Sequence, residues 1–503
     1  MRFLELFRSL NYMLVISIVY FPVSFIVYYL APEYGVYLLY FTFIPALILF
    51  IRWRETRHFI DIKLGEFIDS EYKLRFFSLR YPAFKYVDIY NAVHRYCEDY
   101  PNVKRIQTSH HEDLNTLISG NFYSEDNRKM NTSEMRSWPV DYDAEDFFPQ
   151  DLILLIPAGS IPDPNVSEPI IFRVKFNLSS YEVEVEYALE NYDDKSQDIQ
   201  RFINDYSKEQ SIYKGKTVEL GLATSFKDEY GDVVNSGEMG VYFKKVNEVN
   251  KDDIVLEDHI ERLLERNVFN FHKHRDDLKL AGIPGHKALL FYGPPGTGKT
   301  YTSQYIHGRL EDITTIVVVG TSLNHVKAAC NLARSLQPSL MVLEDVDLVF
   351  TSREINLYSS ALGDLMDELD GFQKKDDVIF ILTTNAIERM EKAIKERPGR
   401  ISQCVHFGMP NKELRERYLK KFVRNYRHED LDTEELAGKI QGATQAFMKE
   451  LVQRAVHISL EENEYNYKDI SLANSHFDIA LTEMTQYDSS SAGLIMGYQN
   501  QIL

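Results

Sequence analysis

The sequence predicts an α/β domain built on parallel strands, preceded by a smaller α+β region and by two membrane-spanning helices. Three observations lead to this prediction. Two long uncharged runs occupy the first 51 residues. A stretch near residue 185 alternates strictly between apolar and charged residues, which indicates a strand with one wet face. Four apolar runs have the composition of buried parallel strands: Ala288–Tyr292, Ile316–Val319, Leu340–Leu343 and Val378–Leu382.

Length and charge limit the classes of protein. The chain has 503 residues, too many for one hydrophobic core, so we expect two or three domains. Its 75 acidic and 56 basic residues give a formal charge of −19, which argues against nucleic acid as a partner. The cysteines, Cys97, Cys330 and Cys404, lie far apart and lack zinc-type spacing, which favours reduced thiols in a cytosolic compartment.

Residues 1–56 are predicted to form a transmembrane hairpin. Tyr12–Leu30 and Gly35–Ile51 hold no charged residue, and as helices they reach about 25–29 Å, enough to cross the hydrocarbon core. Arginines precede the first run and follow the second, whereas the connection carries only Glu33. The positive-inside rule therefore places both ends of this two-span protein in the cytoplasm. A cleaved signal peptide, a buried core hairpin and a single span are the alternatives.

Residues 57–250 are predicted to form a mixed α+β region that binds partners or spaces protomers. We find no catalytic constellation there, and its last five elements follow the order ββαββ. Histidines at 110, 111, 272 and 274 have no third ligand positioned nearby, so they are interpreted as solvated loop residues rather than as a metal site. The predicted elements are a helix at Val87–Tyr96, strands at Pro169–Phe176 and Tyr181–Tyr187, a helix at Asp198–Tyr206, and strands at residues 216–222 and 240–245.

A phosphate-binding loop joins the first apolar strand of the α/β domain to a helix-like segment, Tyr301–Leu310. In such a loop the glycines let backbone N–H groups surround a phosphate. Lys299 then reaches the β- and γ-phosphates, and the Thr300 hydroxyl can bind Mg²⁺. The chain is therefore expected to bind a nucleoside triphosphate, through Gly293, Pro294, Pro295, Gly296, Thr297, Gly298, Lys299, Thr300 and Tyr301.

Polar residues follow two further apolar strands. Glu344 and Asp345 come directly after one of them, and Asn385 follows the next. The carboxyl ends of parallel strands border the crevice where doubly wound sheets bind ligands. There the carboxylates can hold Mg²⁺ and polarise the water that attacks the γ-phosphate, and Asn385 can orient that water.

Two arginines on a stiff turn, Arg397 and Arg400, complete the predicted site. Guanidinium groups bind phosphate in a bidentate manner, and a finger of this kind can raise a rate by about 10³ to 10⁵. Their distance along the chain from Lys299 suits delivery in trans, across a subunit interface, which implies a ring.

With these residues the chain resembles the AAA-type ATPases. Further similarity lies in LMDELDGF, in the run that ends at Arg400, and in Gly442–Ala455, which resembles the start of the family's sensor-2 helix. The resemblance implies a nucleotide-binding α/β subdomain at 251–412, a helical lid at 413–487 and a short tail at 488–503. It also implies rings, hexameric or similar, that hydrolyse Mg-ATP to remodel proteins.

By this resemblance the site residues acquire roles. Gly293–Thr300 is Walker A, Glu344 and Asp345 are Walker B, Asn385 is sensor 1, and Arg397 with Arg400 are arginine fingers. The order Glu–Asp departs from the family's usual Asp–Glu, and LEDVDLVFTSRE resembles the mitochondrial Rieske-protein translocase branch and related bacterial AAA proteins. We assign Asp345 to polarising the water and Glu344 to the Mg²⁺ side, with the reverse assignment as the alternative. Asp345 is one methylene shorter than Glu, so slow hydrolysis is one expectation.

Two absences refine the expected function. Gly320–His325 holds no aromatic residue followed by glycine, the pair that threading unfoldases use to grip a polypeptide. The sequence contains no HExxH, so we expect none of the protease activity of the membrane-anchored AAA metalloproteases. The main hypothesis is a membrane-anchored ATPase that remodels, extracts or translocates unidentified protein clients at the cytosolic face. The alternative is an ATP-gated scaffold that turns over slowly or not at all. A nucleic-acid motor is the weakest hypothesis.

Overall fold

The computed structural model describes residues 74–107, 113–119, 135–157, 169–177, 180–190, 194–222, 226–227, 233–234, 239–247, 249–350, 359–388, 400–428, 431–467 and 470–486. The predicted transmembrane hairpin at residues 1–56 and the predicted tail at residues 488–503 lie outside this set. Within it, no helix combines the length and the apolarity that a membrane span requires.

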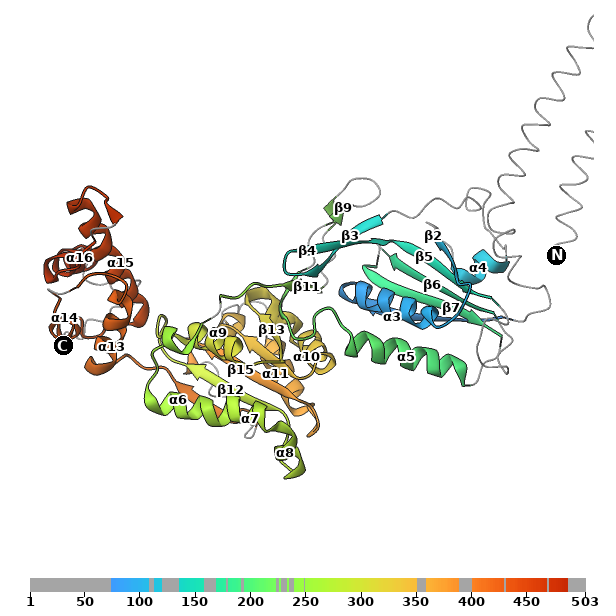
Figure 1. Cartoon of the computed structure of the whole chain (residues 1–503). Coiled ribbons are helices and arrows are strands. Elements are labelled where there is room, and N and C mark those ends of the chain that lie inside the picture. Colours follow the sequence, from blue (N-terminus) through green and yellow to red (C-terminus); the bar gives the residue numbers. More distant parts are fainter. Residues whose placement is uncertain are drawn as a thin grey trace, which may run out of the picture.

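An antiparallel sheet of five strands forms the centre of the middle region (Figure 1). The two predicted neighbouring strands are confirmed, and Val174 lies opposite Val185 in their register. Alternation along the second of these strands places Val183 and Val185 in the core. In the order of the sheet, the strands are β1 (Arg75–Pro82), β7 (Glu182–Leu189), β6 (Ile170–Asn177), β5 (Asp151–Ile156) and β2 (Lys104–Gln107).

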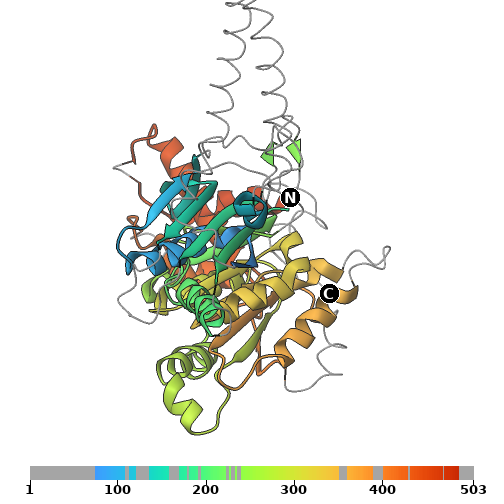
Figure 2. The same ribbon diagram turned by 90° about the vertical axis from the view of Figure 1, so that its right-hand side faces the viewer.

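Helices cover both faces of this sheet (Figures 1 and 2). On one face, α3 (Tyr86–Glu98) and α5 (Lys195–Glu209) share a core with β5, β6 and β7, and both were predicted. On the other, the short helix α4 (Leu114–Ser119) buries two leucines, and it was not predicted. A separate hairpin consists of β3 (Met135–Asp141) and β4 (Ala144–Pro149).

Seven strands form the sheet of the α/β domain, and every neighbouring pair is parallel except β11 and β8. The four apolar runs predicted as buried parallel strands are confirmed as β12 to β15. The order is β11 (Met239–Phe243), β8 (Thr217–Leu222), β13 (Thr314–Val318), β14 (Ser339–Leu343), β15 (Val378–Thr384), β12 (Lys287–Tyr292) and β16 (Gln403–His406).

Two of these strands, β8 and β11, come from the segment that the sequence assigned to the middle region. The predicted order ββαββ is present along the chain, but β8 pairs with β13 and β11 pairs with β8, not with β6 or β7. The α/β sheet therefore begins at Thr217, ahead of the predicted boundary at residue 251. Between them, β9 (Phe226–Lys227) and β10 (Val233–Val234) form a short hairpin. An apolar pattern identifies a strand but not its partner, which explains the difference.

Helices lie on both faces of the α/β sheet, as expected of a doubly wound domain. On one face pack α10 (Val326–Ser335) and α11 (Ser359–Asp370). On the other pack α9 (Lys299–Arg309), α6 (Asp258–Leu264) and α7 (Asn270–Lys273), with a π-helical turn between α6 and α7. The short helix α8 (Arg275–Leu280) projects from the domain (Figure 1).

Four helices with a core of their own occupy the segment expected to form the lid, at one end of the molecule (Figure 1). Side chains of Asn411, Asp432 and Thr444 accept backbone N–H groups at the starts of the first three helices, as N-caps do. The helices are α13 (Lys412–Val423), α14 (Thr433–Lys439), α15 (Gln445–Glu462) and α16 (Asn474–Gln486).

Candidate active site

The loop between β12 and α9 needs glycine at three positions. Gly293, Gly296 and Gly298 have φ angles of 147°, 77° and 95°, which L residues with side chains rarely adopt. A Cβ at Gly293 would lie 2.1 Å from the carbonyl oxygen of Phe407, and one at Gly298 would lie 2.3 Å from the Gln445 side chain. The backbone therefore makes a tight turn whose amides remain accessible at the start of α9.

Lys299 lies inside this loop. Its Nζ donates hydrogen bonds to the carbonyl oxygens of Gly293 at 2.8 Å and Pro294 at 2.9 Å. The residue is only 6% exposed, and burial lowers the pKa of Lys299 to about 8, while Asp345 and Asp347 act in the opposite direction. The loop thus holds a lysine whose charge is poorly solvated, and an anion in the loop would stabilise that charge.

Asp345 and Asn385 meet at the carboxyl ends of β14 and β15. Asn385 Nδ2 donates a hydrogen bond to Asp345 Oδ1 at 3.0 Å. Asp345 has a φ of 48°, in the left-handed region, and its backbone N donates to Thr383 Oγ1 at 3.0 Å. Parallel strands therefore bring together a carboxylate and an amide that lie 40 residues apart.

Glu344, the other predicted carboxylate, lies away from Lys299 and Asn385. It is half-buried, burial raises its pKa, and its electrostatic neighbours include Lys244, Asp345 and Glu219. Lys244 and Glu219 form an ion pair of 2.7 Å. Glu219 is in β8, which in the order of the sheet lies on the far side of β13 from β12 and its loop. Glu344 does not line the cavity that contains Lys299 and Asp345.

That cavity has a volume of about 580 Å³, within the usual range for small-molecule sites. The loop, the strand ends and the lid all contribute to its wall. From the predicted site it is lined by Pro295, Gly296, Gly298, Lys299, Thr300, Tyr301, Asp345 and Asn385. From the lid and the chain before α6 it is lined by Asp253, Lys421, Phe422, Arg424, Asn425, Gln445, Ala446 and Lys449.

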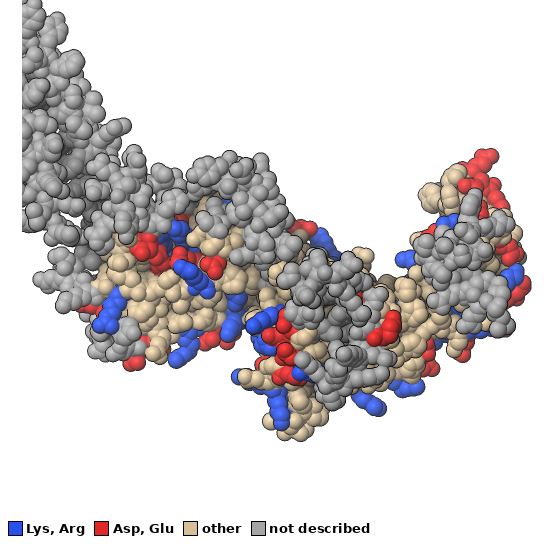
Figure 3. All heavy atoms as spheres, turned by 180° about the vertical axis from the view of Figure 1, so that it is seen from behind, with Lys and Arg blue, Asp and Glu red and all other residues tan. Residues whose placement is uncertain are grey.

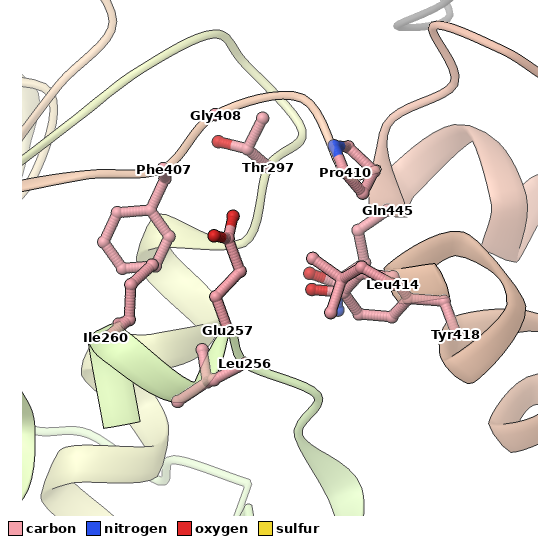
Figure 4. Close-up of a pocket in the computed structure, with 10 residues that line it drawn as sticks. All are labelled: Leu256, Glu257, Ile260, Thr297, Phe407, Gly408, Pro410, Leu414, Tyr418 and Gln445. Carbon is pink, nitrogen blue, oxygen red and sulfur yellow. The ribbon is translucent and has the colours of Figure 1, made fainter. Parts of the chain in front are cut away.

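Several contacts join the lid to the α/β domain around this cavity. Tyr418 Oη donates to the carbonyl oxygen of Val255 at 2.7 Å, and the backbone N of Ala446 donates to the carbonyl oxygen of Gly296 at 3.1 Å. Arg424 pairs with Asp253 at 3.0 Å. A small crevice lies beside them, between α6, the loop and the lid (Figure 4). There Thr297 faces Phe407 and Gly408, on the segment that follows β16 and leads to the lid, and its hydroxyl donates to the carbonyl oxygen of Pro294.

Arg400 lies in its own protomer's ion pairs. Its guanidinium contacts Asp370, and it lies 3.6 Å from Asp367, both on α11. Its side chain is 13% exposed and does not line the cavity. The second predicted arginine, Arg397, lies outside the described residues.

Other sequence predictions concern the surroundings of the site. Gly320–His325 forms a 3₁₀ turn, and Leu323 in it is buried against the core that contains α10. His272 contacts the carbonyl oxygen of Glu311, and no group of three metal-ligating side chains occurs in the described parts of the chain. All three cysteines are free thiols, as expected. Lysines, arginines and acidic residues are interspersed over the described part of the surface in Figure 3, without a broad basic area.

Several lining residues were not predicted. Lys421, Phe422, Arg424 and Asn425 lie at the end of α13, and no motif distinguishes that segment. Gln445, Ala446 and Lys449 fall within the Gly442–Ala455 segment, so their position could have been inferred from it.

Comparison with known proteins finds an AAA domain within the chain. Residues 289–409 match the family described as "ATPase family associated with various cellular activities (AAA)". The chain is 30% identical over 267 residues to ATP-dependent zinc metalloprotease FtsH 2 of Thermoanaerobacter sp. (strain X514), covering 50% of this chain and 50% of that protein. It is 30% identical over 220 residues to a 26S proteasome regulatory subunit 8 homolog of Schizosaccharomyces pombe, covering 38% and 54%. A 27% identity over 288 residues relates it to the ATPase family gene 2 protein of the same yeast, covering 53% and 35%. The chain thus spans about half or less of each relative.

Proposed function

Because this chain belongs to the AAA-type P-loop ATPases, we propose that it is a membrane-anchored enzyme that hydrolyses Mg-ATP to remodel, extract or translocate protein clients at the cytosolic face. One observation carries the ATPase part of the proposal. Lys299, Asp345 and Asn385 line a single cavity that the lid borders. A cation for the phosphates, a carboxylate and an amide are the groups that hydrolysis of a phosphoanhydride requires.

The residues present fit a nucleoside triphosphate. The three glycines of the loop leave room that a Cβ would fill, and Lys299 donates to two loop carbonyls that a phosphate oxygen could replace. Lys299 would bind the phosphates, and Tyr301 and Phe422 offer aromatic surface for the base. Mg²⁺, when bound, neutralises charge on the β- and γ-phosphates.

For hydrolysis, Asp345 would accept a proton from the attacking water and Asn385 would orient that water. The hydrogen bond between Asp345 and Asn385 already aligns the two side chains toward one point of the cavity edge. Thr300 would hold Mg²⁺. Glu344 would be the Mg²⁺-side acid and Asp345 the group that polarises the water, although of the two only Asp345 lines the cavity; comparing Glu344→Gln with Asp345→Asn separates the two roles.

Membrane anchoring rests on the two uncharged runs of residues 12–30 and 35–51, which are long enough to span a bilayer. The client remains a protein of unidentified sequence. The middle region, with its five-stranded sheet, is the part of the chain that we propose for binding it.

Phosphate release tests the proposal. Membranes carrying the full chain are washed at alkaline pH, and the protein is expected to stay in the pellet; loss to the wash would remove the membrane part of the proposal. In the pellet, wild type should release phosphate, Lys299→Ala should release none, and Asp345→Asn should bind ATP but turn over at least about 100-fold more slowly.

The alternative is a scaffold that ATP assembles without appreciable turnover. The short carboxylate of Asp345 and the buried Leu323 in the segment where unfoldases carry a gripping aromatic favour it. Equal phosphate release by wild type and Lys299→Ala, over a range of protein concentrations, would establish the scaffold and contradict the enzyme.

A further inference from the structure

Asp347 lies behind the candidate active site rather than in it. It is 7% exposed and does not line the cavity. Its Oδ1 accepts two hydrogen bonds, from Thr384 Oγ1 at 2.9 Å and from the backbone N of Asn385 at 3.1 Å. One buried carboxylate oxygen therefore holds the backbone at which the Asn385 side chain begins.

Thr383, the neighbour of Thr384 at the end of β15, makes the corresponding contact with the other strand. Its Oγ1 accepts the backbone N–H of Asp345 at 3.0 Å, and both threonines are fully buried. Asp345 adopts a φ of 48°, where most L residues are strained. The threonine hydroxyl thus stabilises the left-handed backbone conformation in which Asp345 lines the cavity.

Asp347, Thr383 and Thr384 together form what we name the cross-strand brace. Its hydrogen bonds join the ends of β14 and β15, and they reach the two residues whose side chains meet at 3.0 Å in the cavity. The preceding residues of β15, Val378–Leu382, are apolar and buried. Within β15, polar side chains occur only at the end of the strand, at Thr383 and Thr384. Apolar side chains there could pack the two strands together, but only hydrogen-bonding groups can orient Asp345 and Asn385.

We infer that Asp347 and Thr383 are positioning residues for ATP hydrolysis: Asp347 fixes the backbone of Asn385, and Thr383 holds Asp345 in its left-handed conformation. The inference rests on the proposed function and adds to it two residues that do not line the cavity. Since neither residue lines the cavity, their loss should affect the chemical step and leave ATP binding nearly unchanged. A misplacement of about 1 Å can cost about 10²-fold in rate.

The test compares kcat and the dissociation constant for ATP in the full-length, membrane-bound chain. Asp347→Ala removes the acceptor for two hydrogen bonds, and we expect kcat to fall about 10- to 100-fold while ATP affinity stays within about threefold. Thr383→Val preserves the shape of the side chain and removes only the acceptor for Asp345, so kcat should fall about tenfold. Asp347→Asn retains an oxygen that can accept from Asn385, and it should recover most of the activity lost in Asp347→Ala.

Thr314→Val is the matched control. Thr314 is a buried threonine at the start of β13, at the opposite end of the same sheet, and its Oγ1 accepts the N–H of Gly215 at 2.9 Å. Its substitution should lower stability about as much as Thr383→Val and leave kcat unchanged.

The outcomes separate the inference from the function on which it rests. If folded Asp347→Ala and Thr383→Val turn over at the wild-type rate, or if kcat and ATP affinity fall together, the positioning role is refuted and the ATPase stands. If Asp347→Ala does not fold, the comparison of kcat between Thr383→Val and Thr314→Val decides whether the positioning role holds. If the wild type binds ATP without turnover, both the inference and the proposed function fail.

Discussion

At the scale of single residues, burial of Lys299 in the loop carries an electrostatic cost. Its ammonium group donates hydrogen bonds to two loop carbonyls, and burial lowers its pKa from 10.5 to about 8. A lysine with a lowered pKa binds fewer protons in the folded than in the unfolded chain between pH 8 and 10.5. The free energy of unfolding therefore rises with pH across that window, and the full cost is present at pH 7.

This cost predicts a pH dependence of ATP binding. Phosphate favours the charged lysine, so binding above pH 8 should take up a proton, and affinity should fall by up to about tenfold per pH unit. Calorimetry in two buffers of different ionisation enthalpy measures that uptake. Lys299→Arg stays charged throughout, so its binding should take up no proton at this site. Equal uptake in both proteins would assign the proton to another group.

The residues of the loop could be predicted from sequence because their geometry is local. The glycine spacing, the lysine and the flanking strand and helix lie within about 20 consecutive residues, so the motif and its context can be found together in the sequence. The same local reasoning located Asp345 and Asn385, since both follow apolar strands. Lys421 and Asn425 could not be found in this way, because they reach the cavity only through the docking of the lid.

At the scale of elements, Asp88 of α3 joins the middle region to the α/β domain. Its carboxylate accepts hydrogen bonds from Ser211 Oγ at 2.7 Å and from the backbone N of Ile212 at 2.8 Å. These residues begin the turn that leads into β8. Burial raises the pKa of Asp88 to about 6, and the hydrogen bonds oppose that shift.

The raised pKa predicts that the Asp88 contact responds to pH. The folded chain binds more protons than the unfolded one between about pH 4 and 6, so this contribution to stability is full below pH 4 and is lost as pH rises through 6. Asp88→Asn should remove the dependence and keep an acceptor for Ile212. Asp88→Ala should lower the free energy of unfolding by about 1–3 kcal/mol, because it removes the acceptor for the part-buried N–H of Ile212 and for the buried hydroxyl of Ser211.

Urea unfolding at pH 5 and pH 7, with hydrogen exchange at the Ile212 amide, measures these effects. A wild-type pH dependence that persists in Asp88→Asn would attribute it to other groups. The two strands beyond this junction were predicted as strands but not as members of the α/β sheet, because pairing between distant segments leaves no local pattern.

At the scale of the whole molecule, the position of Arg400 bears on assembly. Within one protomer it contacts Asp367 and Asp370, so it must leave these carboxylates to reach a neighbour's phosphate. Both carboxylates are more than half exposed, whereas the Arg400 side chain is only 13% exposed, so reaching a neighbour would break ion pairs of a largely buried guanidinium.

Mixing two inactive variants tests delivery in trans. Lys299→Ala lacks a working loop but keeps its arginines, whereas the Arg397→Ala, Arg400→Ala double variant keeps its loop. If the arginines complete a neighbour's site, the mixture should recover at least about a tenth of wild-type turnover. A mixture of Lys299→Ala with Asp345→Asn, whose defects both lie in the predicted cavity, should recover none. No recovery in the first mixture would place the arginines' action within one protomer.

The continuity of α5, its turn and β8 has a mechanical consequence. Only seven residues separate the end of α5 from β8, and all of them are described. A tensile load applied to the five-stranded sheet would therefore reach the backbone ladder between β8 and β13 directly, without a slack tether to absorb it. β13 neighbours β14, whose end carries Asp345. A force on the middle region would thus be transmitted through two neighbouring strands, β13 and β14, to the backbone that carries Asp345.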